Sequence, residues 1–511
     1  MLRERVLFSM KRRQFMKLLA VGATVAAAAP VFAACSQPES TQGDASGTEE
    51  KKNALRVAAI GSPGDQLDPS AASSTATWAG IYALFESLVV TGATGPVMQL
   101  AASAEPNKDA TEWTVKLRDG AKFSDGSPVT AEDVLASFKF TADSQMLGAT
   151  IASIDIKKSS AKDDNTVVFT LQQPRADFVE SVLAKSSLVF KGGDPAKGIG
   201  SGPYVLENGS AADGWSFKAN EHFPAEKRIS DTLEVRVIAD ADARIRAVNS
   251  GEVDLALDLP VVAAKTLGDS AEIWTYGPSD SKNLGLFLNT SVAPFDDVHA
   301  RQAFKLAIDR EKLSKAIFDG HGKPGDDVPG KGMESYPKNL AAKRDVEKAK
   351  KLFAEANVKE LTLTTADVSP GMNDAAHLIA EQLKEAGVSV KVDERDASSY
   401  YSDIPGLMKL PLFATYLQNF PTEYGLQFTS GTNGTFNLSG WGKNAEWDAK
   451  LAKIGATVDD AERTKLVNEL AETYAKDGGT VLWGVQDTLH GRVKGTPDVI
   501  MSQGAPVFVA Q

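Results

Sequence analysis

Hydrophobic positions along the chain follow two spacings, which alternate over most of its length. Short apolar runs predict strands, and apolar residues three or four positions apart predict helices. The predicted strands cover residues 55–60, 113–117, 166–171, 233–238, 253–256, 284–288, 361–365, 388–392 and 480–483. The predicted helices cover residues 78–88, 131–138, 240–250, 298–310, 343–356, 374–386 and 461–476. This alternation indicates an α/β fold in which helices cover sheets.

Several predicted helices begin or end at residues that suit a helix terminus. Asp240 can accept a hydrogen bond at a helix start, and Gly251 follows the same helix where a left-handed residue is needed. Thr130 and Asp133 have the spacing of a capping box. Residues 416–442 are aromatic and rich in Gly and Asn, which predicts mostly loop.

The first 35 residues have the pattern of an export signal. Basic residues come first, an apolar run extends from Leu18 to Phe32, and Ala33-Ala34-Cys35 follows. The run is too short and too rich in Ala to predict a transmembrane helix. The segment resembles a bacterial lipoprotein signal, with Phe32 where that pattern usually has Leu. Cys35, the single cysteine of the chain, is therefore the expected acceptor of a thioether-linked lipid.

Two features of this signal stay open. Residues 12–17, RRQFMK, also resemble a twin-arginine export motif, so export can follow either the general or the twin-arginine route. Translation can begin at Met1 or at Met10, because the first nine residues add nothing that the signal needs. Residues 35–52 contain almost no apolar side chain, which predicts a flexible tether after cleavage.

Charge narrows the class of partner. The formal net charge is −12, and the six basic residues and one acid of residues 1–34 contribute +5, so the remainder carries −17. A domain this acidic is repelled by nucleic acid and by anionic membrane surfaces. We expect a monomer that the lipid on Cys35 holds at the outer face of the bacterial cytoplasmic membrane, extracellular or periplasmic.

Five stretches, in order along the chain, are similar to one family. The longest are residues 113–138, WTVKLRDGAKFSDGSPVTAEDVLASF, and 284–310, LGLFLNTSVAPFDDVHARQAFKLAIDR; shorter ones lie at residues 82–89, 200–205 and 250–256. They resemble the extracytoplasmic solute-binding proteins of peptide-type ABC transporters, the oligopeptide, dipeptide and nickel group of solute-binding family 5. Their glycines and caps shape turns and helix ends, so they indicate a fold, and the ligand site needs separate evidence.

The resemblance implies a two-lobed, periplasmic-binding-protein-like (type II) α/β fold with a third subdomain inserted in the first lobe. Hinge closure would enclose the ligand, and a permease would recognise the closed form. We expect the chain to cross between lobes near Asn283 and near Gly479. The expected segments are residues 1–34 for the signal, 35–52 for the tether, 53–90, 198–283 and 480–511 for lobe I, 91–197 for the inserted subdomain, and 284–479 for lobe II.

One loop of the family carries ligand contacts in its peptide-binding members. The family pattern is Trp-x-x-Asp-Tyr-Pro-Asp, and residues 416–422 of this chain match it as YLQNFPT. Tyr416 stands at the aromatic position, and the alternative for Tyr416 is a core aromatic. Asn419 stands at the position of the acid that pairs with a peptide α-ammonium, and it offers no charge, which argues against a free amine. The acids that could supply the charge instead are Asp65, Asp68 and Glu423.

Other candidate ligand contacts lie at scattered positions. The resemblance implies contacts from the lobe I loop of residues 73–78, SSTATW, which gives Ser74, Thr75 and Trp78; helix capping by Ser74 or Thr75 is the alternative. Trp441 and Trp483 are candidate pocket walls, although isolated Trp residues usually belong to a core.

Some motifs predict no chemistry. Residues 325–332, GDDVPGKG, begin like a phosphate-binding loop but lack the Ser or Thr after Lys331, so we expect a surface loop. The five histidines have no metal-ligand spacing, and neither G-x-S-x-G nor H-E-x-x-H occurs. We therefore expect no metal, no cofactor and no enzymatic activity.

These observations favour a lipid-anchored receptor that captures oligopeptides between two lobes for an ABC permease and its ATPase subunits. One alternative keeps the fold and replaces the peptide by a nickel complex, an opine or an oligosaccharide. Less favoured alternatives are a peptide-sensing co-receptor and an extracellular hydrolase. The sequence alone names neither the ligand and its length nor the permease.

Overall fold

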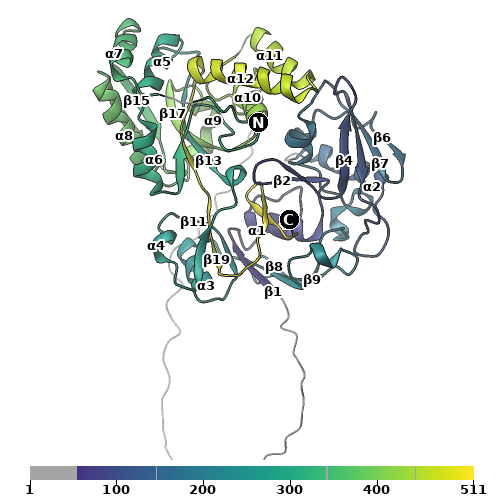
Figure 1. Cartoon of the computed structure of the whole chain (residues 1–511). Helices are drawn as coiled ribbons and strands as arrows, with labels where there is room; N and C mark the ends of the chain where they lie inside the picture. The colour runs from purple at the N-terminus through teal and green to yellow at the C-terminus, as the bar shows by residue number, and fades with distance from the viewer. Residues whose placement is uncertain (1–53, 145–146, 341–342, 443–444, 511) are drawn as a thin grey trace, which may run out of the picture. The chain divides into compact units, whose positions relative to one another are not determined.

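The computed structural model describes residues 54–144, 147–340, 343–442 and 445–510. The predicted signal, the tether and Cys35 lie outside these residues. Three larger β-sheets are visible in Figure 1 as separate groups of strands. We name the part around the seven-stranded sheet lobe I, the part around the four-stranded sheet the inserted subdomain, and the part around the six-stranded sheet lobe II.

Lobe I is built on a mixed sheet. Its strands are β1 (Ala54–Ala59), β8 (Tyr204–Ser210), β9 (Gly214–Ala219), β10 (Thr232–Val237), β11 (Leu255–Leu259), β12 (Ala271–Trp274) and β19 (Leu489–Val493). Their order is β12-β19-β11-β1-β10-β9-β8, with β1 parallel to both of its neighbours. The helices of this part are α1 (Thr75–Leu84), α3 (Ala241–Asn249) and α4 (Ala263–Thr266).

Helices cover both faces of this sheet, as the alternation of elements predicts. In β1 the side chains of Val57 and Ala59 belong to the same core as α1, whereas Ala58 belongs to the core that includes Ile245 and Val248 of α3. Successive side chains of a strand point to opposite faces. Asp240 caps α3 through a hydrogen bond from the N–H of Ala243, which confirms the predicted cap.

The inserted subdomain has an antiparallel sheet and its own core. Its elements are β4 (Ala101–Pro106), β5 (Glu112–Leu117), β6 (Ser160–Asp163), β7 (Thr166–Thr170) and α2 (Ala131–Asp143). The strand order is β4-β5-β7-β6. Trp113, Val115 and Leu117 alternate along β5 and are buried in this core. The predicted capping box of Thr130 and Asp133 is present at the start of α2.

Lobe II carries the second large sheet. Its strands are β13 (Lys282–Leu288), β14 (Gly322–Pro324), β15 (Glu360–Thr365), β16 (Ser389–Glu394), β17 (Leu412–Gln418) and β18 (Thr480–Gln486), in the order β14-β18-β13-β17-β15-β16. The helices are α5 (Val298–Ala307), α6 (Arg310–Phe318), α7 (Val346–Glu355), α8 (Met372–Glu385), α9 (Ile404–Leu407), α10 (Thr422–Ser430), α11 (Ala445–Ala456) and α12 (Asp460–Asp477). The sheet with α5 to α8 is the upper left part of Figure 1.

Two short hairpin-like pairs complete the described strands. They are β2 (Val89–Thr91) with β3 (Pro96–Met98), and β20 (Ile500–Ser502) with β21 (Ala505–Val507). The second pair lies against α1, so the C-terminal segment helps to cover lobe I.

Strand β18 corrects the expected end of lobe II. β18 pairs with β13 in the second sheet, from Phe287 opposite Thr480 to Lys282 opposite Gln486. The chain therefore crosses back to lobe I after Gln486 and not near Gly479. The apolar run of β18 is buried along its whole length and would suit either sheet. Its partner depends on long-range pairing that local periodicity does not encode.

Residues 416–442 lie mostly outside helices and strands, as predicted, but they include the end of β17, which extends to Gln418, and the whole of α10. The helix predicted over residues 298–310 is two helices, since α5 ends at Ala307 and Asp309 caps a new helix through the N–H of Lys312. A capping aspartate inside an apolar pattern is the signal for this break.

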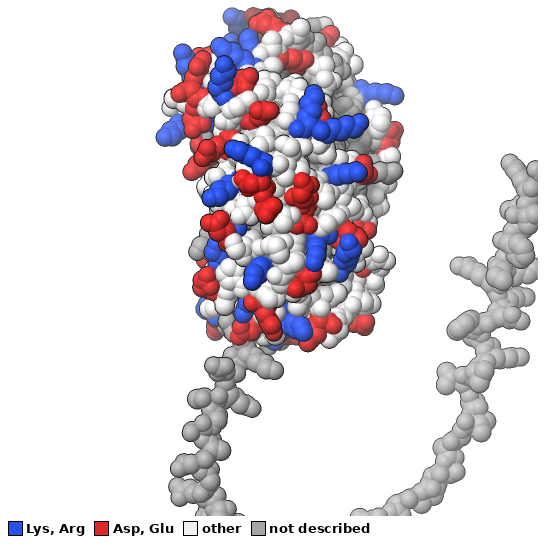
Figure 2. Space-filling view, turned by 90° about the vertical axis from the view of Figure 1, so that its right-hand side faces the viewer, with Lys and Arg blue, Asp and Glu red and all other residues white. Residues whose placement is uncertain are grey.

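Figure 2 shows the side of the molecule that carries the inserted subdomain. Lys and Arg are interspersed with Asp and Glu over this face, and they form no continuous basic surface in this view. Acidic and basic side chains are therefore mixed on this face, although the net charge of the chain is −12.

Candidate functional site

The two crossings between lobe I and lobe II are joined by a buried histidine. Nε2 of His490 lies 2.8 Å from Oδ2 of Asp280, and the N–H of Asp258 donates to Nδ1 of His490 at 3.2 Å. Because Nδ1 accepts that bond, we assign the proton to Nε2, which donates to Asp280. The Thr488 hydroxyl also donates to the carbonyl of Asp280. The first crossing, with Asp280, is thus fastened to the second, with Thr488 and His490.

Asn419 is the centre of a second buried network, at the end of β17. Its Nδ2 donates to the carbonyls of Pro278 and Lys331 at 2.9 and 3.0 Å. Its Oδ1 accepts from the N–H of Gly330 at 2.8 Å and from Nδ2 of Asn283 at 3.0 Å. The side chain is 2% exposed. The protein itself therefore uses both donors and both lone pairs of this amide.

This network explains why an amide stands where the family pattern has an acid. A carboxylate has acceptors only, so an aspartate at position 419 would face the carbonyl oxygens of Pro278 and Lys331 without a proton to share. Burial would make that arrangement costly. Asn419 thus joins the first crossing, the loop near Gly330 and the end of β17, and it has no free group for a ligand amine.

Tyr416 lies near the first crossing, is partly exposed, and packs against the core of lobe II. It stands on β17 opposite Leu284 of β13. The ammonium of Lys282 lies 5.8 Å from the centre of the Tyr416 ring and 3.6 Å from Oδ1 of Asp258 in lobe I. Lys282 thus places the Tyr416 ring next to a residue of lobe I. Because Tyr416 is partly exposed and close to both lobes, it remains a candidate ligand contact.

Ser74 caps the start of α1, which confirms the alternative prediction that Ser74 serves as a helix cap. Its hydroxyl accepts from the N–H of Thr77 at 3.2 Å and donates to Oδ2 of Asp65 at 2.5 Å. Burial opposes the charge of Asp65, but hydrogen bonds from Ser74, Ser62 and Thr77 outweigh it and lower the pKa of this carboxyl. The charge of Asp65 is thus already held by the start of α1.

Thr75 and Trp78 are the more open members of this group. Thr75 is the first residue of α1 and is partly exposed. Trp78 is also partly exposed, and its ring lies 5.7 Å from that of Tyr82 beside the core of lobe I. Within the described residues no hydrogen bond or ring contact joins Thr75 or Trp78 to Tyr416 or Asn419. Their role as ligand contacts stays a prediction.

Of the two remaining candidate tryptophans, Trp483 belongs to the interior of lobe II, and Trp441 is partly buried against a lobe II core. Trp483 on β18 is 1% exposed and stacks on Phe318 with a centroid distance of 5.3 Å. Trp441 packs against Trp447 and Tyr474, and the guanidinium of Arg301 lies 5.4 Å from its ring. Trp483 therefore leaves the set of candidate pocket walls, and Trp441 contributes to a lobe II core.

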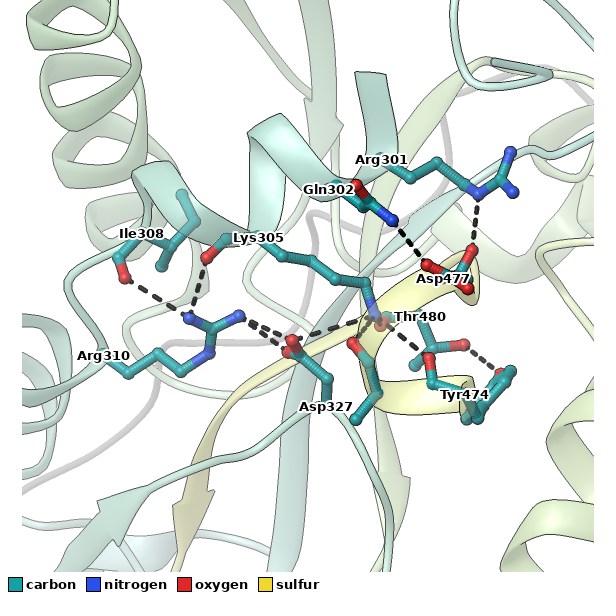
Figure 3. A network of polar contacts seen from close by, with 10 residues as sticks. Arg301, Gln302, Lys305, Ile308, Arg310, Asp327, Tyr474, Asp477 and Thr480 are labelled. Carbon is teal, nitrogen blue, oxygen red and sulfur yellow. Dashed lines mark hydrogen bonds and ion pairs between the residues drawn. The ribbon is translucent and has the colours of Figure 1, made fainter. Parts of the chain in front are cut away.

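The expected surface loop is buried, and this prediction was wrong. Residues 325–330 are all buried, and Figure 3 shows how Asp327 is held. Both oxygens of Asp327 accept from Arg310 Nη2 at 2.8 Å, and Lys305 Nζ lies 3.7 Å from Oδ2. Asp327 thereby attaches the loop to α5 and α6.

Lys305 is held by backbone carbonyls as well. Its ammonium donates to the carbonyls of Ala475 and Thr480, each at 2.8 Å, and more weakly to that of Tyr474 at 3.4 Å (Figure 3). Burial lowers the pKa of Lys305 to about 8, although Asp327 opposes the shift. These bonds join the end of α12 and the start of β18 to α5.

Arg301 and Gln302 extend the same network. Arg301 Nε donates to the carbonyl of Asp477 at 2.7 Å, and Gln302 Nε2 donates to Oδ1 of Asp477 at 2.6 Å. A half-open hollow of about 320 Å³ lies beside Gln302, Lys305 and Asp327. None of the candidate ligand residues lines it. We interpret this network as the internal frame of lobe II.

His490, Asp280 and Lys282 were not predicted from the sequence. His490 is one of five scattered histidines, and its partner Asp280 is 210 positions away. The only local signal for His490 is that this histidine stands in a short strand whose first residues are buried, β19. Within the described ranges, no helix has the length and apolar character to cross a membrane. The same ranges contain no group of three or more His, Cys, Asp or Glu placed to hold a metal ion.

Comparison with known proteins identifies the class. The model of the bacterial extracellular solute-binding proteins, family 5 (middle region) matches residues 95–437. That match covers more than half of the chain, and the chain belongs to this family. The two-lobed periplasmic-binding-protein fold with an inserted subdomain agrees with it.

Individual relatives cover most of the chain. The probable D,D-dipeptide-binding periplasmic protein DdpA of Escherichia coli K12 is 28% identical over 81% of this chain and 85% of its own length. The solved structure of HbpA2 from Haemophilus parasuis has a TM-score of 0.75 at 20% identity and covers 90% of this chain and 99% of its own. AgaA from A.tumefacien R10, solved with agropinic acid, has a TM-score of 0.68 at 26% identity, with 86% and 94% covered.

Proposed function

We propose that this protein is the lipid-anchored receptor of an ABC importer, which captures short peptides between lobes I and II and delivers them unchanged to a membrane permease. Relatives named for dipeptides and for oligopeptides support the peptide class. Cys35 would carry the lipid after cleavage of the signal, and the ATPase subunits would act through the permease. On this proposal the chain is not an enzyme.

One observation carries the proposal. In the described part of the chain, the two large sheets are connected by two neighbouring crossings, which the pair of Asp280 and His490 fastens together. Two short connections that lie side by side are the arrangement expected of a hinge, because a few residues can absorb the rotation of one rigid lobe against the other. Ligand contacts to both lobes would shift the population toward the closed form.

The ligand contacts we propose lie on both sides of these crossings. Tyr416 would contribute from lobe II, and Thr75 and Trp78 from lobe I. Asn419 would position the crossing and not bind the ligand directly, because its amide is fully used within the protein. A peptide ligand would then be held through its backbone and its carboxyl end more than through a free amine.

The second candidate is a non-peptide solute such as an opine, and two observations favour it. Position 419 offers no charge to a peptide amine, and AgaA, solved with agropinic acid, is similar to this chain over most of its length. A nickel complex or an oligosaccharide would be further members of this alternative.

Thermal unfolding with added solutes separates the candidates. The C35S chain should gain stability from a mixed pool of short peptides, in proportion to ligand concentration, and none from a pool of sugars. A matched pool of N-acetylated peptides should be as effective as the free peptides, because no acid awaits the amine at position 419. Stabilisation by opines but not by either peptide pool would select the second candidate. Mass spectrometry of material that co-purifies with the protein would name the ligand.

A further inference from the structure

The inserted subdomain contacts lobe II through a small set of direct bonds. The N–H of Ala176 donates to the carbonyl of Gly455, at the end of α11, at 2.6 Å. Arg175 Nη2 lies 3.4 Å from Oε1 of Gln427 on α10. Because one side belongs to the inserted subdomain and the other to lobe II, these bonds must break if the two parts separate.

Charged residues surround these bonds on both sides. On the subdomain side Arg175 holds Asp177 through two hydrogen bonds of 2.9 and 2.6 Å, and Glu180 follows in the short helix Val179–Leu183. On the lobe II side Nε of Arg463 lies 3.3 Å from Oε2 of Glu423. Arg175 is thus bonded to Asp177, and the guanidinium paired with Glu423 is that of Arg463.

Two carboxyl oxygens at this contact have no donor. Oε2 of Glu180 and Oε1 of Glu423 are buried, and neither has a hydrogen-bond partner among the described residues. An ionised carboxylate accepts hydrogen bonds and donates none, so each of these oxygens has lost its hydration without replacement. A proton on either carboxyl group would remove the charge and supply a donor.

The electrostatic surroundings favour such a proton. Burial, with Asp177 adding to it, raises the pKa of Glu423 to about 8, against the opposing effect of Arg463. Burial also raises the pKa of Glu180. Asp177 behaves differently, because the Arg175 guanidinium outweighs burial and lowers the pKa of that carboxyl.

The other titratable groups at this contact are Lys185, Tyr424 and Asp460. The ammonium of Lys185, from the inserted subdomain, lies 3.9 Å from the ring centre of Phe420 and 4.3 Å from that of Tyr424. Burial lowers the pKa of Lys185 to about 7 and raises that of Tyr424 to about 12. Asp460 binds Arg463 at 2.5 Å from a largely exposed position.

We propose that this contact is a proton-dependent latch: closure of lobe II against the inserted subdomain takes up a proton on the pair Glu180 and Glu423, so that acidity strengthens closure and ligand capture. The latch rests on the proposed function in one respect, that the lobes open and close. It needs no particular ligand.

The direction of the pH effect follows from the ordinary and shifted values. The pKa of Glu423 rises from 4.5 to about 8, so its contribution to closure is full below the ordinary value and is lost as the pH rises through 8. The pKa of Lys185 falls from 10.5 to about 7, so Lys185 favours closure as the pH rises above 7. The two effects oppose each other above neutrality, and from pH 7 down to the ordinary glutamate pKa the pair Glu423 and Glu180 acts without opposition from Lys185.

The test measures closure directly and without ligand. The full chain carrying C35S has no other cysteine, so donor and acceptor dyes can be attached at Lys162→Cys on β6 and Lys453→Cys on α11, both exposed. Energy transfer between pH-insensitive dyes then reports the closed fraction from pH 5 to pH 7. The ratio of closed to open molecules should rise by close to tenfold for each pH unit lowered.

Two glutamate variants decide the outcome. The double variant E180Q/E423Q should show no dependence on pH in this range, because Gln supplies a donor without titrating. Glu446→Gln, a change at an exposed glutamate of α11 paired with Lys450, should keep the wild-type slope. A flat wild-type profile, or the wild-type slope retained in the double variant, would overturn the latch. Adding the short-peptide pool to the same proteins tests the peptide ligand separately, since its failure to change energy transfer would leave the pH slope intact.

Discussion

Two buried groups of charged residues in this molecule differ in how completely their polar atoms are hydrogen-bonded. In the frame of lobe II, both oxygens of Asp327 are bound by Arg310, and three carbonyls surround Lys305. The exception in this frame is Arg310 Nε, a buried atom that has no hydrogen-bond partner within the described part of the chain. At the contact between the inserted subdomain and lobe II, the buried acids Glu180 and Glu423 each have one oxygen that accepts no hydrogen bond from a described residue.

This difference fits the places of the two groups, one inside a single lobe and the other at a contact between two parts. A network inside one lobe never separates, so each buried charge can be matched once and permanently. On our proposal the inserted subdomain and lobe II separate, so the acids at their contact would be hydrated in the open state and buried in the closed state. We therefore expect changes in the first group to alter unfolding, and changes in the second to alter closure.

The largest expected effect comes from removing Arg310. Arg310→Ala leaves the buried Asp327 without its guanidinium, which should lower the free energy of unfolding by about 3–5 kcal/mol. Urea unfolding followed by circular dichroism measures this loss. Lys350→Ala removes a partner from the exposed pair with Glu347 and should cost less than about 1 kcal/mol. Equal losses in the two variants would remove the distinction between a framework charge and a surface charge.

Replacing Asn419 by Asp tests the network at the first crossing. The carboxylate cannot donate to the carbonyls of Pro278 and Lys331, so unfolding at pH 7 should be easier by about 1–3 kcal/mol. Part of the loss should be recovered as the pH falls, because a protonated Asp regains a donor. Asn208→Asp, at an exposed position of β8, serves as the control. A fully stable Asn419→Asp protein that gains affinity for free-amine peptides would contradict the structural role we assign to Asn419.

A smaller effect on unfolding is expected at the latch. Because the pKa of Glu423 is raised, the wild-type protein should lose stability relative to Glu423→Gln as the pH rises from 5 to 8. Allowing for solvent screening, we expect a difference of about 1–2 kcal/mol at pH 8. Thermal melts over this range measure it. A variant less stable than the wild type at pH 8 would show that the ionised carboxylate is well paired after all.

The smallest effect on stability should come from Tyr416. Its hydroxyl has no hydrogen-bond partner among the described residues, so Tyr416→Phe should change unfolding by less than about 0.5 kcal/mol. If the hydroxyl contacts the ligand, affinity should fall by about five- to tenfold, measured from the ligand-dependent thermal shift. Tyr401→Phe removes a hydroxyl that bonds to Thr415 at 2.7 Å and should leave affinity unchanged. Unaltered affinity in Tyr416→Phe would remove the hydroxyl of Tyr416 from the site.

Local patterns were most informative where an element is defined by its own residues. Asp240 and the pair Thr130 and Asp133 predicted helix starts that the structure confirms, because a cap depends on neighbours three residues away. The same reasoning failed for residues 325–330, which are buried although Asp326 and Asp327 are among them. Burial of Asp327 depends on Arg310 of another element, and no spacing rule connects the two residues.

The candidate site shows the same division. The sequence alone indicated an exported, acidic α/β protein of the solute-binding kind, and it singled out position 419 by the absence of a charge. Only the tertiary structure decided that the Asn419 amide is enclosed by four hydrogen bonds, that β18 pairs with β13, and that His490 meets Asp280. Periodicity and caps are set by residues within one or two turns, whereas strand order and buried polar partners depend on contacts between segments far apart in the sequence.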